Sequence, residues 1–154
     1  MINWINHRFG INLNANDLES IKDFSLIWNI FERFVCQNNF SIQGVEQAIA
    51  TKNINRAEFQ PQLEYFRNRY ISNGMVNLKF HNLHLRANDR SAFVESVLKG
   101  NANADLEVIL GMVIIVYRYR NNLFHGIKDI QVIDQQKGNF DNANIFLKSL
   151  LAYF

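Results

Sequence analysis

The feature that most constrains the fold of this chain is an apolar run over residues 108–117, the longest in the sequence. It is about half as long as the roughly 20 apolar residues that a bilayer span needs, so it indicates a buried core segment. The surrounding segment, residues 105–125, is apolar on most sides at first and polar later, and Gly126 follows it as a helix stop. Its β-branched residues alone favour a strand, but its length and continuing pattern favour a helix. We therefore expect a central helix that is buried all round in its first half and emerges toward solvent over residues 117–125.

The composition is that of a globular chain with room for a core. The chain has 154 residues, of which 48% are hydrophobic and 13% aromatic, with one Pro and seven Gly. These values predict a single domain over residues 1–154 and exclude a disordered tail, a collagen-like repeat and a Pro/Gly-rich linker protein. The formal charge is only +2, so no global field favours a nucleic acid or a membrane. Any phosphate-binding site must therefore be local.

The chain has a single cysteine, Cys36, which excludes an internal disulfide. It lies in an apolar helical stretch, where we expect a small core residue rather than a nucleophile. Residues 1–16 lack the charged-then-apolar layout of a signal peptide. These features predict a protein that is not exported and works in a reducing cytoplasm.

Helical signals precede the central segment. Apolar residues recur at three- and four-residue steps over residues 18–35, which is the stripe of an amphipathic helix. Ser41 can cap a short second helix. Pro61 is tolerated only in a first turn, so it predicts a helix from Pro61 to about Ile71.

The remaining segments complete the expected bundle. Residues 75–85 partly alternate and are compatible with a short strand or an irregular loop. Asn88 or Asp89 can cap a helix that ends at Gly100, and Asp141 can cap a last helix. Together these segments predict an all-α bundle.

Residues 118–126, which read RYRNNLFHG, carry the chemistry that the sequence suggests. On a helix, Asn121 and His125 lie on one face, and the long side chain of Arg120 can swing toward them. An arginine offers a planar, permanently charged fork to phosphate oxygens, and a histidine can take or give a proton near neutral pH. Both residue types also favour the last turn of a helix, where they complement its dipole and bond its free carbonyls. From the residues alone, a phosphodiester site and a simple helix cap both remain open.

The same segment resembles the signature of the HEPN family, an Arg and a His with four to six residues between them and often a polar residue directly after the Arg. Arg120 and His125 have four residues between them, and Asn121 follows the Arg. Arg118 also satisfies the spacing, with six residues between. Residues 26–32, LIWNIFE, look like the first long helix of this family. The resemblance implies an all-α, HEPN-like helical bundle that forms a face-to-face homodimer.

In HEPN ribonucleases this pattern implies metal-independent RNA cleavage at a site that two protomers form together. Carried over to this chain, His125 would transfer the proton at the ribose 2′-hydroxyl or the leaving oxygen, Arg120 would stabilise charge on the scissile phosphate, and Asn121 would orient the pair. The expected product end is a 2′,3′-cyclic phosphate, and neither a metal nor another cofactor is required. The analogy also implies a toxin or defence effector, restrained by a separately encoded antitoxin or sensor protein. The alternative is a non-catalytic HEPN module for RNA binding, protein binding or dimerisation.

Several neighbouring residues are candidates for binding the substrate. Tyr119 could stack on a base or pack the dimer. Glu32 could reach the cleft and hold Arg118 or Arg120, or it could be a solvated helix charge. The full set of candidates is Arg118, Tyr119, Asn122, Lys128 and Glu32.

Two weaker signals complete the survey. Arg67, Arg69 and Lys128 could extend a phosphate track, although scattered basic residues usually form only a soluble surface. His81 and His84 lie three apart, but no third ligand accompanies them at a recognisable spacing, so they indicate a surface pair rather than a metal site.

Overall fold

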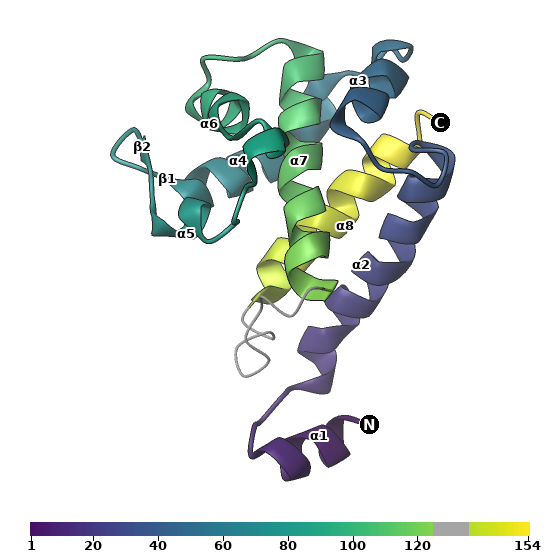
Figure 1. Ribbon diagram of the computed structural model, residues 1–154, viewed down its shortest axis with the longest axis vertical. Coiled ribbons are helices and arrows are strands. Elements are labelled where there is room, and N and C mark those ends of the chain that lie inside the picture. Colours follow the sequence, from purple (N-terminus) through teal and green to yellow (C-terminus); the bar gives the residue numbers. More distant parts are fainter. Residues whose placement is uncertain (125–135) are drawn as a thin grey trace.

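The structure, a computed structural model, describes residues 1–124 and 136–154, and the described chain is predominantly helical (Figure 1). Within these residues, eight α-helices are joined by two 3₁₀ turns and one antiparallel two-stranded hairpin. The elements in chain order are α1 (Ile2–Phe9), α2 (Ala15–Phe34), α3 (Ile42–Ala50), η1 (Arg56–Phe59), α4 (Gln60–Tyr70), β1 (Ile71–Ser72), β2 (Met75–Val76), α5 (Leu78–His81), η2 (Ala87–Asp89), α6 (Ser91–Lys99), α7 (Asp105–Phe124) and α8 (Lys137–Leu151). This arrangement confirms the all-α prediction.

The helix α7 lies at the centre of the molecule (Figure 1). Every residue from 108 to 116 is buried, as the apolar run predicts. Helices α3 and α6 pack against α7, and α2 and α8 pack against each other beside it. At Gly111, an added Cβ would lie 2.9 Å from the Val97 side chain of α6, so this glycine permits the close approach of the two helices. Among the described helices, none is both long enough and apolar enough to cross a membrane.

An aromatic cluster joins α2 to α7. Trp28 of α2 is 1% exposed, and its ring centroid lies 5.5 Å from that of Phe40 and 6.0 Å from that of Tyr117. The rings of Phe40 and Tyr117 are stacked, with centroids 3.9 Å apart. Because aromatic pairs add to the free energy gained by area burial, this cluster fixes α2 against the helix that carries the candidate site.

Several local signals in the sequence act as predicted. The Ser41 hydroxyl accepts a hydrogen bond from the Gly44 N–H at 3.0 Å and caps α3. Pro61 lies in the first turn of α4. Gly100 ends α6 with a left-handed φ of 81°. The expected helical stripe over residues 18–35 corresponds to α2, which begins slightly earlier.

Other helix boundaries differ from the predictions. Arg90, with φ 52°, precedes α6, while Asp89 belongs to η2 and accepts a hydrogen bond from the Arg86 N–H at 2.7 Å. Asp141 lies inside α8 rather than before it, because its carboxylate binds the Ser20 hydroxyl and the Lys137 ammonium. In both cases an acidic side chain that looks like a cap has another partner.

Two further segments were not anticipated in detail. Residues 75–85 form the strand β2, the short helix α5 and the turn that follows, so each alternative applies to part of the segment and neither includes the helix. The N-terminal helix α1 had no sequence prediction. The predicted end of the central helix at His125 and its stop at Gly126 lie outside the described residues.

Candidate functional site

The carboxyl half of α7 is polar in sequence but stays largely inside the protein. Arg118, Tyr119, Asn121 and Asn122 are each between 1% and 3% exposed, and Arg120 is half-buried. The expectation that this part of the helix emerges toward solvent is therefore wrong. Since buried polar groups are stable only when they are hydrogen-bonded, the partners of these side chains determine what each can do.

Arg118 forms the polar centre of this region. Its Nη1 lies 3.3 Å from Oδ2 of Asp89, its Nε donates to the Leu83 carbonyl at 3.2 Å, and its Nη2 donates to Oδ1 of Asn122 at 3.2 Å. Nδ2 of Asn122 donates to the same Leu83 carbonyl at 3.1 Å. Burial lowers the pKa of Arg118, while the charge of Asp89 opposes that effect. These bonds join α7 to the segment between α5 and α6.

The contacts of Arg118 and Asn122 indicate a structural role. Both were predicted to bind substrate, and that contact stays a prediction. It would require the hydrogen bonds between α7 and the segment between α5 and α6 to break. The ion pair of Arg118 goes to Asp89 and not to Glu32, whereas an interaction of Glu32 with Arg120 stays a prediction. Glu32 is half-buried near Cys36, whose pKa is raised to about 12 by burial and by this carboxylate. Cys36 is buried, as expected of a core residue.

Tyr119 packs inside the protein. Its hydroxyl is hydrogen-bonded to that of Tyr70, and its ring centroid lies 6.1 Å from those of Phe66 and Phe140. Burial raises the pKa of Tyr119 well above its usual value, so the phenol is neutral at physiological pH. Tyr119 thus packs within the core of the chain itself, and the two roles considered for it, base stacking and packing of the dimer, stay predictions.

Arg120 and Asn121 are adjacent residues near the carboxyl end of α7. Nη1 of Arg120 donates to Oδ1 of Asn121 at 3.1 Å. This contact joins two of the three residues of the predicted catalytic set, and the orienting role of Asn121 stays a prediction. His125 and Lys128, the other residues of the predicted site on this segment, lie outside the described residues.

Sequence reasoning missed the partners of this helix end. Asp89 was interpreted as a helix cap, and the Leu83 carbonyl carried no signal of its own. An acidic residue that could pair with Arg118 was expected on α2, whereas the segment before α6 supplies it.

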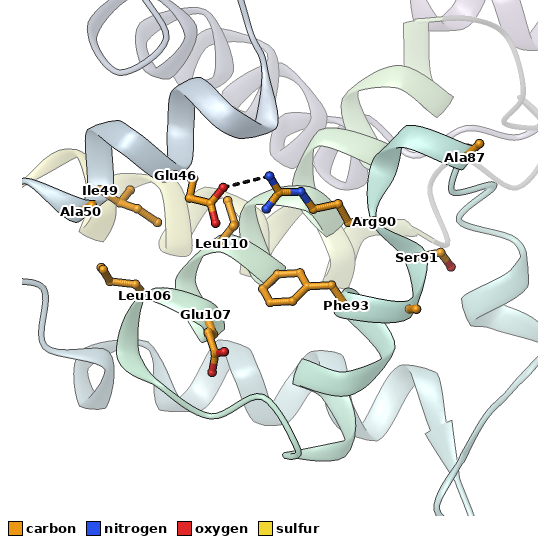
Figure 2. A pocket seen from close by; sticks show the side chains of 11 residues that line it. Glu46, Ile49, Ala50, Ala87, Arg90, Ser91, Phe93, Leu106, Glu107 and Leu110 are labelled. Atoms are coloured by element: carbon orange, nitrogen blue, oxygen red, sulfur yellow. Dashed lines mark hydrogen bonds and ion pairs between the residues drawn. The ribbon is translucent and has the colours of Figure 1, made fainter.

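The structure also contains a larger cavity elsewhere (Figure 2). It measures about 650 Å³ and lies between α3, α6 and the first turns of α7. An ion pair of 2.9 Å joins Glu46 of α3 to Arg90, and apolar side chains such as Phe93 and Leu110 line the walls (Figure 2). None of the predicted site residues is among the described residues that line this cavity.

No metal site accompanies these features within residues 1–124 and 136–154. His81 and His84 are exposed, as predicted, and no group of three or more His, Cys, Asp or Glu side chains that could hold a metal occurs in the described chain.

Comparison of the chain with protein-family models, curated proteins and solved structures finds no match.

Proposed function

We propose that this protein is a metal-independent endoribonuclease of the HEPN type, acting in the cytoplasm as a toxin or defence effector. His125 transfers the proton at the ribose 2′-hydroxyl or the leaving oxygen, Arg120 stabilises charge on the scissile phosphate, and Asn121 orients the pair. The ribose 2′-hydroxyl attacks the adjacent phosphorus, a new P–O2′ bond forms and the P–O5′ bond breaks. The products are a 2′,3′-cyclic phosphate and a 5′-hydroxyl end.

The observation that carries this proposal is the difference between the two arginines at the end of α7. The guanidinium of Arg118 is 1% exposed and bonded to Asp89, Leu83 and Asn122. Arg120 is only half-buried and contacts the Asn121 amide. Arg120 is also the arginine that precedes His125 by the shorter spacing. This supports Arg120, and not Arg118, as the arginine that acts with His125.

A second copy of the chain is the proposed partner, and an exposed apolar surface on α2 and α8 supports dimerisation. Leu26, Ile30 and Phe34 recur at every fourth residue of α2 and are 66%, 47% and 65% exposed. Ile145 of α8 lines the same groove as Leu26 and Ile30. Contiguous exposed apolar side chains of this kind mark interaction surfaces. A separately encoded antitoxin or sensor protein would restrain the active dimer.

The decisive experiment incubates the purified protein with a single-stranded RNA in EDTA and follows cleavage. The wild type should cleave, and Arg120→Ala and His125→Ala should each lose activity by at least about 100-fold, the size of one general acid–base contribution. Arg33→Ala and His7→Ala remove the same residue types from exposed helix positions and should keep full activity. An RNA with a 2′-deoxy nucleotide at the cleaved position should resist cleavage, because it lacks the nucleophile.

Two further measurements test dimerisation separately from RNA cleavage. Sedimentation should give a dimer for the wild type, and Ile30→Asp should give a folded monomer that has lost cleavage. Equal activity of all variants would contradict the proposal. Retained RNA or protein binding without cleavage would instead establish the alternative, a non-catalytic HEPN module.

A further inference from the structure

A small polar cavity of about 210 Å³ lies beside the carboxyl end of α7, between the end of α4, the helix α5 and the start of α8. Arg69 and Lys79 contribute positive charges to its wall, and Asn82, Gln136 and Asn139 contribute amides. Leu83 lines it as well, and the carbonyl of this residue is the one that binds Arg118 and Asn122. The backbone of Leu83 therefore links the wall of this cavity to the carboxyl end of α7.

The guanidinium of Arg69 is only partly satisfied by hydrogen bonds. Its Nη2 donates to Oε1 of Gln136 at 3.4 Å, and its Nε is buried without a hydrogen-bond partner. Among the described residues, no carboxylate forms an ion pair with it. Since burying a charge is costly unless that charge is paired, an anion that enters the cavity would complete this site.

The tyrosines around Arg69 do not supply that negative charge. Burial raises the pKa of Tyr70 to about 12, although the hydrogen bond from Tyr119 and the charge of Arg69 act to lower it. Tyr70 is consequently neutral at pH 7, as is Tyr119. The exposed ammonium of Lys79 adds a second positive charge at the cavity.

The opposite wall is formed by the first turn of α8 and is already held in place. Asn139 is 2% exposed, accepts a hydrogen bond from the Tyr65 hydroxyl at 2.9 Å and donates one to Gln136 at 2.6 Å. The N-terminus of a helix carries a partial positive charge that attracts anions. This wall thus favours the same kind of ligand as Arg69 and Lys79.

We propose that this cavity is a binding site for a phosphate group, with Arg69 and Lys79 supplying the charge and the Asn82 amide a further hydrogen bond. Its volume lies below the roughly 300 Å³ at which pockets for drug-sized ligands begin, so it fits a phosphate better than a whole nucleotide. A guanidinium is suited to phosphate because its planar fork matches the phosphate oxygens. The proposal goes beyond the nuclease activity, since the phosphate can belong to an RNA strand or be free in solution.

The first test titrates the wild-type protein with inorganic phosphate at low ionic strength by calorimetry. Arg69→Gln should weaken saturable phosphate binding at least about 10-fold, which corresponds to about 1.4 kcal/mol. The matched control is Arg33→Gln, which removes the same charge from an exposed position of α2. Arg33→Gln should bind phosphate like the wild type.

The second test identifies the source of the phosphate. It measures binding of short single-stranded RNAs, with and without a 5′-phosphate, in a His125→Ala background that prevents cleavage. A loss caused by Arg69→Gln with both RNAs identifies a backbone phosphate, and a loss confined to the 5′-phosphorylated RNA identifies a terminal one. Phosphate binding with no effect on either RNA identifies free phosphate.

The proposal is overturned if wild-type protein shows no saturable binding of phosphate, or if both arginine variants weaken it equally. Because phosphate binding is measured without cleavage, failure of the nuclease proposal would leave this test intact. Circular dichroism of each variant establishes that a loss of binding is not a loss of fold.

Discussion

Arg118 of α7 and Arg69 of α4 have contrasting surroundings. Arg118 is fully enclosed and ion-paired with Asp89, whereas Arg69 is half-buried and has no carboxylate partner in the described chain. Burying a guanidinium costs free energy in both places, but only Arg118 has a carboxylate of its own chain to offset that cost. An arginine paired within its own chain stabilises the fold, whereas an arginine without a carboxylate partner, beside the Lys79 ammonium in the same cavity, indicates an anionic ligand.

The largest expected effect comes from breaking the balanced pair. Asp89→Ala should destabilise the protein by about 3–5 kcal/mol, because it leaves Arg118 buried and uncompensated. Urea unfolding at pH 7 measures the change. Glu46→Ala is the control, since the pair of Glu46 with Arg90 is exposed and should contribute at most about 1 kcal/mol. Equal losses in the two variants would remove the distinction drawn between the balanced and the exposed pair.

A second variant would make the surroundings of Arg69 resemble those of Arg118. Gln136→Glu places a carboxylate at the side chain that already accepts a hydrogen bond from Arg69. We expect phosphate affinity to fall at least about 10-fold, while stability changes by less than about 1 kcal/mol. Gln47→Glu adds the same charge at an exposed position of α3 and should leave phosphate affinity unchanged. Unaltered affinity in Gln136→Glu would show that Arg69 is not the phosphate ligand.

The smallest expected effect is on tyrosine titration. The folded-state pKa of Tyr70 is raised from 10.0 to about 12. Tyr70 therefore contributes stability that is fully present below pH 10 and is lost as the pH rises toward 12. The Arg69 charge lowers this pKa, so Arg69→Gln should shift the late phenol titration to still higher pH. Ultraviolet absorbance of the phenolate measures the shift, and Tyr70→Phe identifies which part of the titration belongs to Tyr70. An unchanged curve would mean that the charge of Arg69 does not reach Tyr70.

Periodic apolar patterns and local caps could be predicted from the sequence because they depend on near neighbours. The buried half of α7, the cap of α3 by Ser41 and the end of α6 at Gly100 are all of this kind. The boundaries that were wrong involve residues whose partners are distant in the chain. Asp89 pairs with Arg118 and Asp141 binds Ser20, and neither contact leaves a local signal.

The candidate site was predictable to a similar degree. The motif at the end of α7 identified Arg120 and Asn121, which the structure places in contact. The spacing alone fits both Arg118 and Arg120, and the different tertiary partners of these two arginines left no local signal. Arg69 was named in the sequence only as one of several basic residues that could extend a phosphate track, because its lack of a carboxylate partner depends on the tertiary structure.

The Leu83 carbonyl accepts hydrogen bonds from both Arg118 and Asn122, and these bonds affect which segments unfold together. The connection between α5 and α6 has little regular structure of its own, and segments of that kind commonly fray at small free-energy cost. Unfolding of the connection between α5 and α6 would break hydrogen bonds of two buried side chains of the central helix, Arg118 and Asn122, at once. The connection and the carboxyl end of α7 should therefore belong to a single cooperative unit of local unfolding, and the amide protons of the two segments should exchange with solvent together.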